Sequence, residues 1–378
     1  MPESPSPTKA RYIMIGGFLG AGKTTAVAKL AQRLTERGLK VGLITNDQGR
    51  ELVDTQMLRA KGFATEEIPG GCFCCRFNSL VEAAGKLTDA TQPDVFVAEP
   101  VGSCTDLVAT VTYPLRRIYG DQFTIAPVSV LVDPVRAARV LGLEGGGNFS
   151  EKVVYIYKKQ LEEADILVIN KVDLLGPERI EQLRTALAAQ FPRAEILTVS
   201  ARDGTDLDAW FARLERDEHG QHATMDVDYD VYADGEALLG WLNATAQFEA
   251  ATPFDAERAL TALAREIQDR LRAQSAEIAH LKMTYSPDEA LAGEIAAVNL
   301  VRNDFVPELS LKLPEPSKRG QLIINLRAEN APEALAQTIR DALHAVERLT
   351  PTLTAQLHHL EHFRPGRPTP THRDQLPA

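Results

Sequence analysis

Short apolar runs alternate with amphipathic stretches over the first half of this chain. The runs are rich in Val and Ile and too short for helices, which is typical of parallel strands covered on both faces. We expect strands at 12–15, 41–45, 95–98, 128–132, 166–169 and 196–199. Between the first two runs, apolar residues from Val27 to Leu34 share one helical face, and Gly38 follows as a stop. This alternation predicts an α/β fold with an open parallel sheet, whose ligands bind at the carboxyl ends of the strands.

The pattern changes after residue 216. Acids alternate with tyrosines between 226 and 234, which we interpret as a solvated linker, because the Gly and terminal Glu of an EF-hand calcium loop are missing. Amphipathic helices are expected at 260–271 and 335–343, around apolar runs at 280–285, 295–301, 309–313 and 322–326. The predicted parts are a disordered lead-in (1–9), a P-loop NTPase domain with helices on both faces of its sheet (10–216), a linker (217–251), a smaller α+β domain (252–350) and a tail (351–378), which is Pro-rich and extended from residue 364 onward.

A phosphate-binding motif follows the first expected strand. Residues 17–24 read GFLGAGKT, which fits G-x-x-x-x-G-K-[ST], and they stand between a strand and a helix as a P-loop does. Glycines let backbone N–H groups approach phosphate oxygens, and the helix N-terminus adds positive potential. We expect Lys23 to reach the β- and γ-phosphates and the Thr24 hydroxyl to bind Mg²⁺, both with catalytic roles. The nucleotide-binding residues expected here are Gly17, Gly20, Ala21, Gly22, Lys23, Thr24 and Thr25.

An acidic residue at the end of the third expected strand indicates the magnesium side of the same site. Glu99 directly follows the run 95–98, and Gly102 comes shortly after. An acid at this position suits a ligand of Mg²⁺ or of its water, and a glycine suits a backbone sensor of the γ-phosphate. Many strands end in Glu, so Glu99 gains its significance from the P-loop beside it.

The residues after the fifth expected strand predict a guanine pocket. They read NKVD and end at Asp173, whose carboxylate can accept hydrogen bonds from both the ring N–H and the exocyclic amine of guanine. Adenine lacks that pair of donors and would leave a buried carboxylate unpaired. We expect Lys171 to lie along the base and ribose and Asn170 to brace the loop. Ser200 and Ala201, after the sixth strand, match a loop that covers guanine O6 through backbone N–H groups, so the expected nucleotide is GTP.

Three of the four cysteines stand within four positions, on a loop that begins with two glycines. Cys72, Cys74 and Cys75 can approach one soft cation, Zn²⁺ or Co²⁺, which would convert the thiols to thiolates. A closed structural zinc site needs four protein ligands, and the side chains of the neighbours Cys74 and Cys75 are expected to diverge. One position would then stay open, which suits transfer of the metal. A buried or redox-active thiol cluster is the alternative, and Cys104 is interpreted as a packing residue that could approach the same region.

The overall charge narrows the range of partners. The formal net charge is -11, which disfavours nucleic acid and anionic membrane as partners. No apolar run approaches the ~20 residues of a membrane-spanning helix, and the Pro- and Ser-rich start lacks the core of a signal peptide. We therefore expect a cytoplasmic protein, in which crowded cysteines indicate metal or redox chemistry and not disulfides.

The P-loop, the Cys-x-Cys-Cys loop, the Glu99-x-x-Gly102 segment and the Asn-Lys-x-Asp loop together resemble the CobW-like GTPases, which are related to the nickel chaperones of hydrogenase and urease. The resemblance extends over the whole chain and implies slow GTP hydrolysis, zinc at the cysteine loop and delivery to a client metalloprotein, with a homodimer left open. Metal affinity would be linked to nucleotide state, because this loop falls where GTPases carry their switches. The sequence departs from the family at 46–50, where NDQGR replaces Asn-Glu-Phe-Gly, and Asp47 is expected near the metal or Mg²⁺.

Two other functions remain open at this stage. A GTPase assembly factor or switch, acting on a cobalamin-dependent or other metalloenzyme partner, would need no metal delivery. A small-molecule kinase is disfavoured by the guanine loop. The spacing of His358 and His362, with His359 between them, would place two imidazoles on one helix face. We favour a solvated helix face over a metal site.

Overall fold

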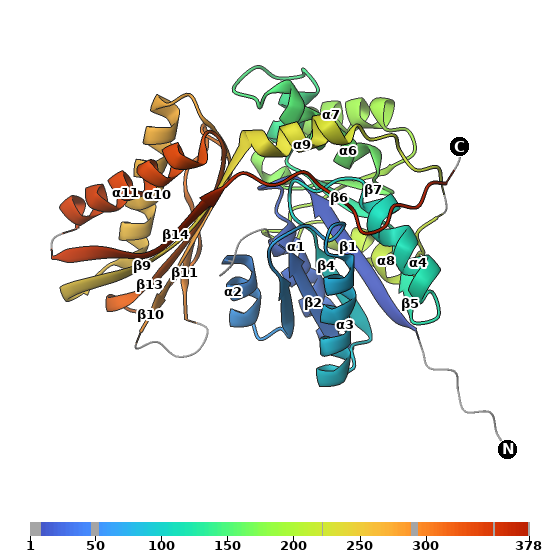
Figure 1. Ribbon diagram of the computed structural model, residues 1–378, viewed down its shortest axis with the longest axis horizontal. Coiled ribbons are helices and arrows are strands. Elements are labelled where there is room, and N and C mark those ends of the chain that lie inside the picture. The colour runs from blue at the N-terminus through green and yellow to red at the C-terminus, as the bar shows by residue number, and fades with distance from the viewer. Residues whose placement is uncertain (1–8, 47–52, 221, 289–293, 351, 377–378) are drawn as a thin grey trace.

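The computed structural model describes residues 9–376 except 47–52, 221, 289–293 and 351. The chain folds into two units that lie side by side, one built on a parallel sheet and the other on an antiparallel sheet (Figure 1). None of the described helices is long and apolar enough to cross a membrane.

The first sheet is parallel and has the strand order β3-β2-β4-β1-β6-β7-β8, with β5 paired to β1. Its strands are β1 (Ala10–Gly17), β2 (Val41–Asn46), β3 (Thr65–Ile68), β4 (Val95–Glu99), β5 (Phe123–Ile125), β6 (Ser129–Val132), β7 (Ile166–Ile169) and β8 (Glu195–Thr198). All six expected strands are present. The strands β3 and β5 were not predicted, because they are only four and three residues long and β3 carries two glutamates.

Helices cover both faces of this sheet, as expected. They are α1 (Lys23–Glu36), α2 (Val53–Ala60), α3 (Phe77–Thr91), α4 (Tyr113–Tyr119), α5 (Pro134–Val140), α6 (Glu151–Glu162), α7 (Pro177–Gln190) and α8 (Leu207–Arg216), with the short turns η1 (Val108–Thr112) and η2 (Val172–Leu174). Alternate residues of β1 enter different cores: Ile13 packs with Leu30 and Trp210 on one side, and Tyr12 packs with Phe77 and Tyr157 on the other. Burial on both faces explains why the strands read as continuous apolar runs.

The second sheet is antiparallel and has the order β12-β11-β10-β13-β9-β14. Its strands are β9 (Leu239–Phe254), β10 (Glu277–Pro287), β11 (Ala296–Leu300), β12 (Glu308–Leu311), β13 (Ser317–Glu329) and β14 (Leu353–Phe363). The helices α10 (Ala256–Ala273) and α11 (Pro332–Leu349) pack on one face, where Leu260 and Ile339 join Ile324 in a shared core. Both expected helices and the four expected strands are present.

The boundaries of the second unit differ from those expected. The segment 217–251 is not a solvated linker throughout, because it contains α9 (Tyr229–Leu238) and the first part of β9. The Asp228 carboxylate caps α9 by accepting from Asp230 and Val231 N–H, and Tyr232 is buried. The segment 351–378 likewise includes β14. Since β14 is a strand, the interpretation of its histidines as sharing a helix face is wrong.

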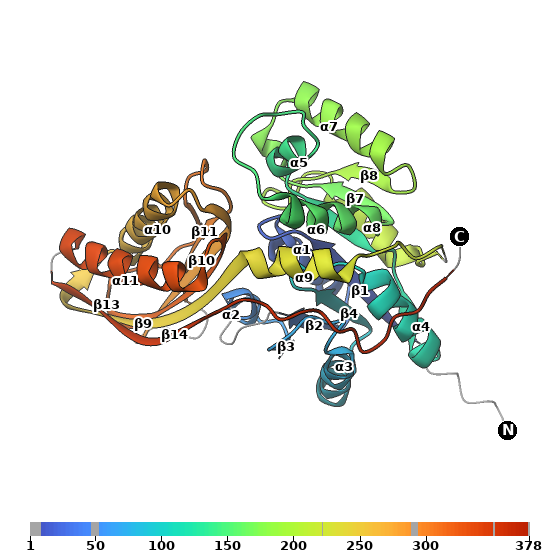
Figure 2. The same ribbon diagram turned by 45° about the horizontal axis from the view of Figure 1, so that its top comes forward.

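The two units are joined by shared packing. Leu239, Trp241 and Ala279 of the second unit belong to a core of the first. The residues after β14 then run back over the first unit towards α4, as the dark red coil shows in Figure 2. Along this path Thr371 N–H donates to Cys74 O at 2.8 Å and Asp374 N–H donates to Ala109 O at 2.9 Å. This C-terminal segment, 364–376, is therefore bonded to the first unit through its backbone.

Candidate nucleotide and metal site

The loop between β1 and α1 is shaped by glycines at positive φ. Gly17 has φ 130° and Gly22 has φ 97°, and a Cβ on either would lie about 2.5 Å from a neighbouring atom, Leu131 O or Asn170 Nδ2. Only glycine fits both the backbone angles and the space. The Lys23 ammonium donates to Gly17 O at 2.9 Å and so lies within the loop. This is the arrangement of backbone and cation that a phosphate-binding loop requires.

Thr24 and Glu99 meet although they are far apart in the chain. Strands β1 and β4 are parallel neighbours, so their carboxyl ends lie together. There the Thr24 hydroxyl donates to Glu99 Oε1 at 3.0 Å, and both side chains are buried. A hydroxyl and a carboxylate are the oxygen ligands that Mg²⁺ prefers, so this pair fits the ion. Gly102 lies directly against the loop, since a Cβ there would be 2.7 Å from Leu19 Cδ2.

Asn170 connects three loops at the other end of the site. Its Nδ2 donates to Ala21 O at 2.9 Å, and its Oδ1 accepts from Ala201 N–H at 2.9 Å. The Ser200 hydroxyl donates to Asp173 Oδ1 at 2.8 Å, and Arg202 lies 3.3 Å from Asp173 Oδ2. The expected guanine-binding side chains are thus brought together on one side of the loop.

Lys171 takes part in a buried charge cluster that the motif alone did not reveal. Its ammonium donates to Gly20 O at 2.6 Å and to Asp133 Oδ2 at 2.8 Å. Arg302, from the second unit, lies 3.1 Å from Asp133 Oδ1. Burial would raise the pKa of Asp133, but the charges of Lys171, Arg302 and Arg136 outweigh it and hold that pKa below its ordinary value. Asp133 therefore anchors Lys171 as a carboxylate.

A cavity of about 520 Å³ lies beside these loops, between the two units. From the first unit it is lined by Gly20, Gly22, Lys23, Thr24, Thr25, Asn46, Glu99, Gly102, Asn170, Lys171, Ala201 and Arg202, and from the second by Trp241, His280, Lys282, Asn299 and Glu308 among others. Asp173 borders the cavity through Arg202. The sequence motifs did not predict that the second unit lines this cavity, because its cavity-lining residues belong to no motif.

The cysteine loop brings its three thiols together. The Sγ–Sγ distances are 2.6 Å for Cys72–Cys74, 3.2 Å for Cys72–Cys75 and 3.7 Å for Cys74–Cys75. The expected divergence of Cys74 and Cys75 is therefore wrong. The reason is a tight turn, in which Cys75 and Arg76 N–H both donate to Cys72 O and wrap the side chains to one side. Cys72 and Cys74 are buried and Cys75 is partly exposed.

The thiols differ in their readiness to lose a proton. Hydrogen bonds from Cys104, Cys74 and Cys75 lower the pKa of Cys72 well below its ordinary value. The same network raises the pKa of Cys74 well above it, and Cys72 as hydrogen-bond partner raises the pKa of Cys75 to about 11. Cys104 is buried in the same core and joins this network. A metal at this site must therefore displace protons from the other thiols, which couples its binding to pH.

Asn46 links the cysteine loop to the nucleotide cavity. It ends β2 and lines the cavity, and its Nδ2 donates to Gly71 O at 2.6 Å and to Ile68 O at 2.9 Å. The next residue, Asp47, was expected near a metal and lies outside the described residues.

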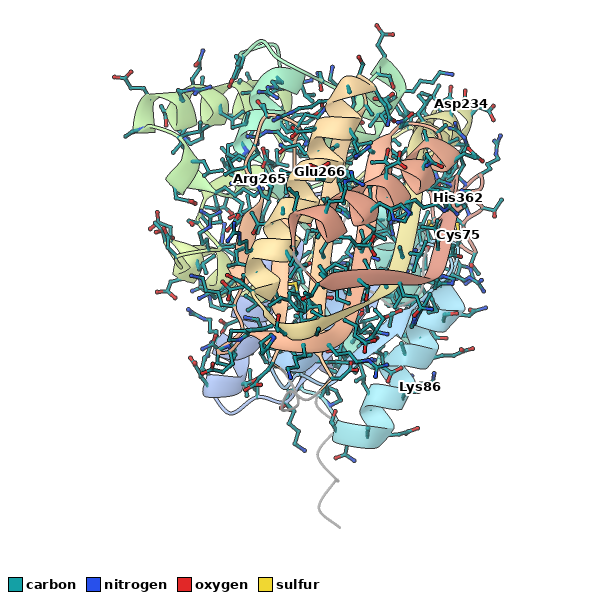
Figure 3. The ribbon with its side chains drawn as sticks, turned by 90° about the vertical axis from the view of Figure 1, so that its left-hand side faces the viewer. Cys75, Lys86, Asp234, Arg265, Glu266 and His362 are labelled. Carbon is teal, nitrogen blue, oxygen red and sulfur yellow. The ribbon has the colours of Figure 1, made fainter. Side chains whose placement is uncertain are left out.

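The C-terminal segment covers the cysteine loop on its other side. Thr369 N–H lies 3.2 Å from Cys75 Sγ and points its hydrogen at the sulfur. Glu361 of β14 lines a small surface cavity together with Pro69 and Gly70, which stand at the start of the same loop. Figure 3 shows Cys75 and His362 on the same side of the molecule. Among the described residues, His358, His359 and His362 join no group of side chains close enough to share a metal.

A second group of metal-ligating side chains lies before β7, at the opposite edge of the sheet. Ligand atoms of Asp165, His219 and His222 are within 4.8 Å of one another. The Asp165 carboxylate already accepts from Val128 N–H at 2.7 Å and pairs with the His219 imidazole. These bonds give the group a structural role without a metal. The sequence did not reveal it, because Asp165 stands far along the chain from the two histidines.

The first unit of this chain matches a known protein family. The family described as CobW/HypB/UreG, nucleotide-binding domain, matches residues 11–198. The zinc chaperone CobW of Sinorhizobium sp is 28% identical over 213 residues, which is 50% of this chain and 58% of that protein. The zinc chaperone YeiR of Escherichia coli is 32% identical over 178 residues, 46% of this chain and 50% of that one.

The crystal structure of Zn(II)-bound YjiA GTPase from E. coli is 16% identical, with a TM-score of 0.37, and the match covers 89% of this chain and 99% of that one. The chain spans only about half the length of the curated relatives it matches. The matched residues contain the phosphate loop, the cysteine loop and the guanine loop described above. This chain therefore carries a nucleotide-binding domain of the CobW/HypB/UreG family.

Proposed function

We propose that this protein is a metallochaperone that binds and hydrolyses GTP, carries Zn²⁺ at Cys72, Cys74 and Cys75, and delivers it to a client metalloprotein. Three findings support the proposal: the family of residues 11–198, the zinc chaperones among its relatives, and three converging thiols on a loop that Asn46 connects to the nucleotide cavity. The names of the relatives favour zinc over cobalt as the cargo.

The nucleotide would lie in the cavity with its phosphates at the glycine loop and its base at Asp173. Lys23 would exchange its bond to Gly17 O for a phosphate oxygen, and Asp173 would accept from guanine. Mg²⁺, held by Thr24 and Glu99, would neutralise charge that develops on the phosphates. Among the residues that the structure describes in the first unit, no side chain is an evident strong base for the attacking water, so we expect slow hydrolysis.

The cysteine loop suits a cargo site with one open position. Tetrahedral zinc with bonds of about 2.3 Å requires sulfur atoms about 3.8 Å apart. The three observed distances are 2.6, 3.2 and 3.7 Å, so small side-chain rotations, mainly of Cys72 and Cys74, would fit the ion. Three thiolates leave the fourth position for a ligand of the client. Transfer could then proceed by ligand exchange without a free ion.

The observation that carries the proposal is the contact of Asn46 with the cysteine loop. Asn46 lines the nucleotide cavity and holds Gly71 O, the carbonyl directly before Cys72. The residues after β2 are where GTPases respond to the γ-phosphate. A shift of Asn46 on hydrolysis would therefore reach the thiols directly.

A release assay tests this proposal. Reduced, zinc-loaded protein is mixed with a chromogenic zinc chelator and with Mg²⁺ and either GTP or a non-hydrolysable analogue. We expect zinc to leave at the rate of phosphate production with GTP and to be retained with the analogue. The Cys72→Ser/Cys74→Ser/Cys75→Ser variant serves as the metal-free control. Hydrolysis without any zinc binding would instead support the GTPase switch that needs no metal.

A further inference from the structure

Strand β10 of the second unit reaches the phosphate end of the nucleotide cavity. The Lys282 ammonium lies 3.4 Å from the Thr24 hydroxyl oxygen. His280, two residues earlier, is on the same face of the strand, and both side chains line the cavity. Within the described residues, the buried Nε2 of His280 has no hydrogen-bond partner. The second unit thus presents nitrogen-bearing side chains where the first unit binds phosphate.

This strand is held firmly against the phosphate loop. A Cβ on Gly20 would lie 3.0 Å from Val301 Cβ and 3.2 Å from Ala279 O, so the loop is in direct contact with β10 and with the residue that follows β11. Arg136 of α5 donates to Val301 O at 2.5 Å. Together with the Asp133–Arg302 ion pair, these contacts fix the position of Lys282 relative to the loop.

Charge also favours a phosphate ligand at this point. Burial lowers the pKa of His280 well below its ordinary value, and the charges of Lys282, Arg327 and Lys23 lower it further. Several cations therefore converge in a region screened from water, where an anion is stabilised more strongly than at the surface. The triphosphate of a nucleotide is the polyanion that this end of the cavity would hold.

We propose that Lys282 binds a phosphate oxygen of GTP, so that the second unit completes the nucleotide site. This inference rests on the proposed function, since it assumes that GTP binds in the cavity. Lys282 would turn from Thr24 towards the phosphates when Mg²⁺ takes its place beside Thr24 and Glu99. Loss of the γ-phosphate would then weaken the attachment of the second unit, and nucleotide state would be transmitted to it by reciprocal coupling.

The test compares ligands that differ only in their phosphates. Affinities for a non-hydrolysable GTP analogue, GDP and guanosine are measured calorimetrically with Mg²⁺ for the full chain, Lys282→Ala, Lys282→Arg and Lys318→Ala. Lys318 is an exposed lysine of β13 and serves as the matched control. For Lys282→Ala we expect about 10- to 100-fold weaker binding of the GTP analogue, the range for loss of a hydrogen bond to a charged group. Guanosine binding should be unchanged, and Lys282→Arg should keep most of the affinity.

Two outcomes would overturn the inference while leaving GTP binding intact. Equal losses for guanosine and the GTP analogue would assign Lys282 a structural role. Unchanged or tighter binding of the analogue by Lys282→Ala would show that Lys282 competes with Mg²⁺ and does not contact phosphate. If the unaltered protein binds no guanine nucleotide, the proposed function fails first and the inference with it. Thermal unfolding without nucleotide checks that each variant is folded.

Discussion

The phosphate loop and the cysteine loop lie at the same edge of the parallel sheet, yet they are built in different ways. The phosphate loop is shaped by backbone, with glycines at positive φ and a lysine bonded to carbonyl groups. The cysteine loop is also turned by backbone hydrogen bonds, but the groups that it offers to a ligand are side chains, a network of thiols that share protons. The first can accept a phosphate without a change in its own protonation, whereas the second must release protons before it holds a metal.

The two loops are also covered by different parts of the chain. Strands of the second unit close the cavity over the phosphate loop, and the C-terminal segment lies on the cysteine loop through Thr369 and Thr371. Asn46 donates a hydrogen bond to the cysteine loop and also lines the nucleotide cavity. The two sites therefore have separate coverings and are connected through Asn46. The predictions below test that separation and that connection.

The largest expected effect is a loss of nucleotide affinity that leaves zinc affinity unchanged. Lys23→Ala removes the buried ammonium from the phosphate loop, and we expect the affinity for a GTP analogue to fall about 100-fold or more, as for a buried charge pair that loses one partner. Zinc affinity without nucleotide should stay the same. Calorimetry with the analogue and chelator competition with zinc measure the two properties. Lys40→Ala, an exposed lysine before β2, is the control. A parallel loss of zinc affinity would contradict independent sites.

A change at Asp173 should alter which base is bound and leave the metal unaffected. Asp173→Asn replaces one acceptor with an amide donor, so we expect GTP affinity to fall about 10- to 100-fold, the range for loss of a hydrogen bond to a charged group. Xanthosine triphosphate carries a carbonyl in place of the guanine amine, and we expect the variant to bind it more tightly than the unaltered protein does. Competition binding with both nucleotides measures the switch. Asp121→Asn, at an exposed position, should change neither value.

The effect of pH should distinguish the two loops in one protein. Zinc must displace the thiol proton of Cys75, whose pKa is raised to about 11, and that of Cys74, whose pKa is also raised. These protons leave only when the metal binds. At pH values below the pKa of Cys75, the apparent zinc affinity should therefore rise about tenfold per pH unit for each proton released. Affinity for the GTP analogue should vary much less. Zinc affinity that is flat between pH 6.5 and 8.5 would refute binding through the thiols.

The smallest expected effect concerns the connection itself. Asn46→Ala removes the hydrogen bond from β2 to Gly71 O of the cysteine loop and the one to Ile68 O at the end of β3. We expect zinc affinity to fall about 3- to 10-fold, within the range for one or two hydrogen bonds. More importantly, the effect of nucleotide on zinc affinity should disappear. Asn299→Ala is the matched control, because Asn299 also lines the cavity but bonds to Ser310. If nucleotide changes the zinc affinity of Asn46→Ala as much as that of the unaltered protein, Asn46 does not connect the two sites.

The sequence predicted what short motifs and continuous apolar runs encode. The six strands that were predicted in the first unit contain short apolar runs, and the phosphate loop must read as glycines followed by Lys23 and Thr24. By contrast, β9 was missed because it contains Ala, Asn and Thr where Val and Ile are usual. Its long pairing with β13 and β14 makes it a strand. In β14 the spacing of His358 and His362 is typical of a helix face, and the pairing of β14 with β9 makes the segment a strand.

Contacts between distant segments could not be predicted in the same way. Lys282 stands in no motif, and its place near Thr24 depends on how the second unit packs on the phosphate loop. The meeting of Cys74 and Cys75 depends on two backbone hydrogen bonds within a tight turn. The Pro-rich segment after β14 has no periodicity, so the sequence does not predict its position over the thiols, where it bonds to Cys74, Cys75 and Ala109.

The central claim is that nucleotide state controls metal affinity. The most direct measurement is the zinc affinity of the reduced protein at one pH, by chelator competition, with a non-hydrolysable GTP analogue, with GDP and without nucleotide. The account predicts one zinc per chain, no zinc in the triple Cys→Ser variant, and affinities that differ between the analogue and GDP by about 5- to 150-fold, the usual range of coupling between sites. Equal affinity in all three states would contradict it, and the protein would then be a GTPase whose metal site works independently.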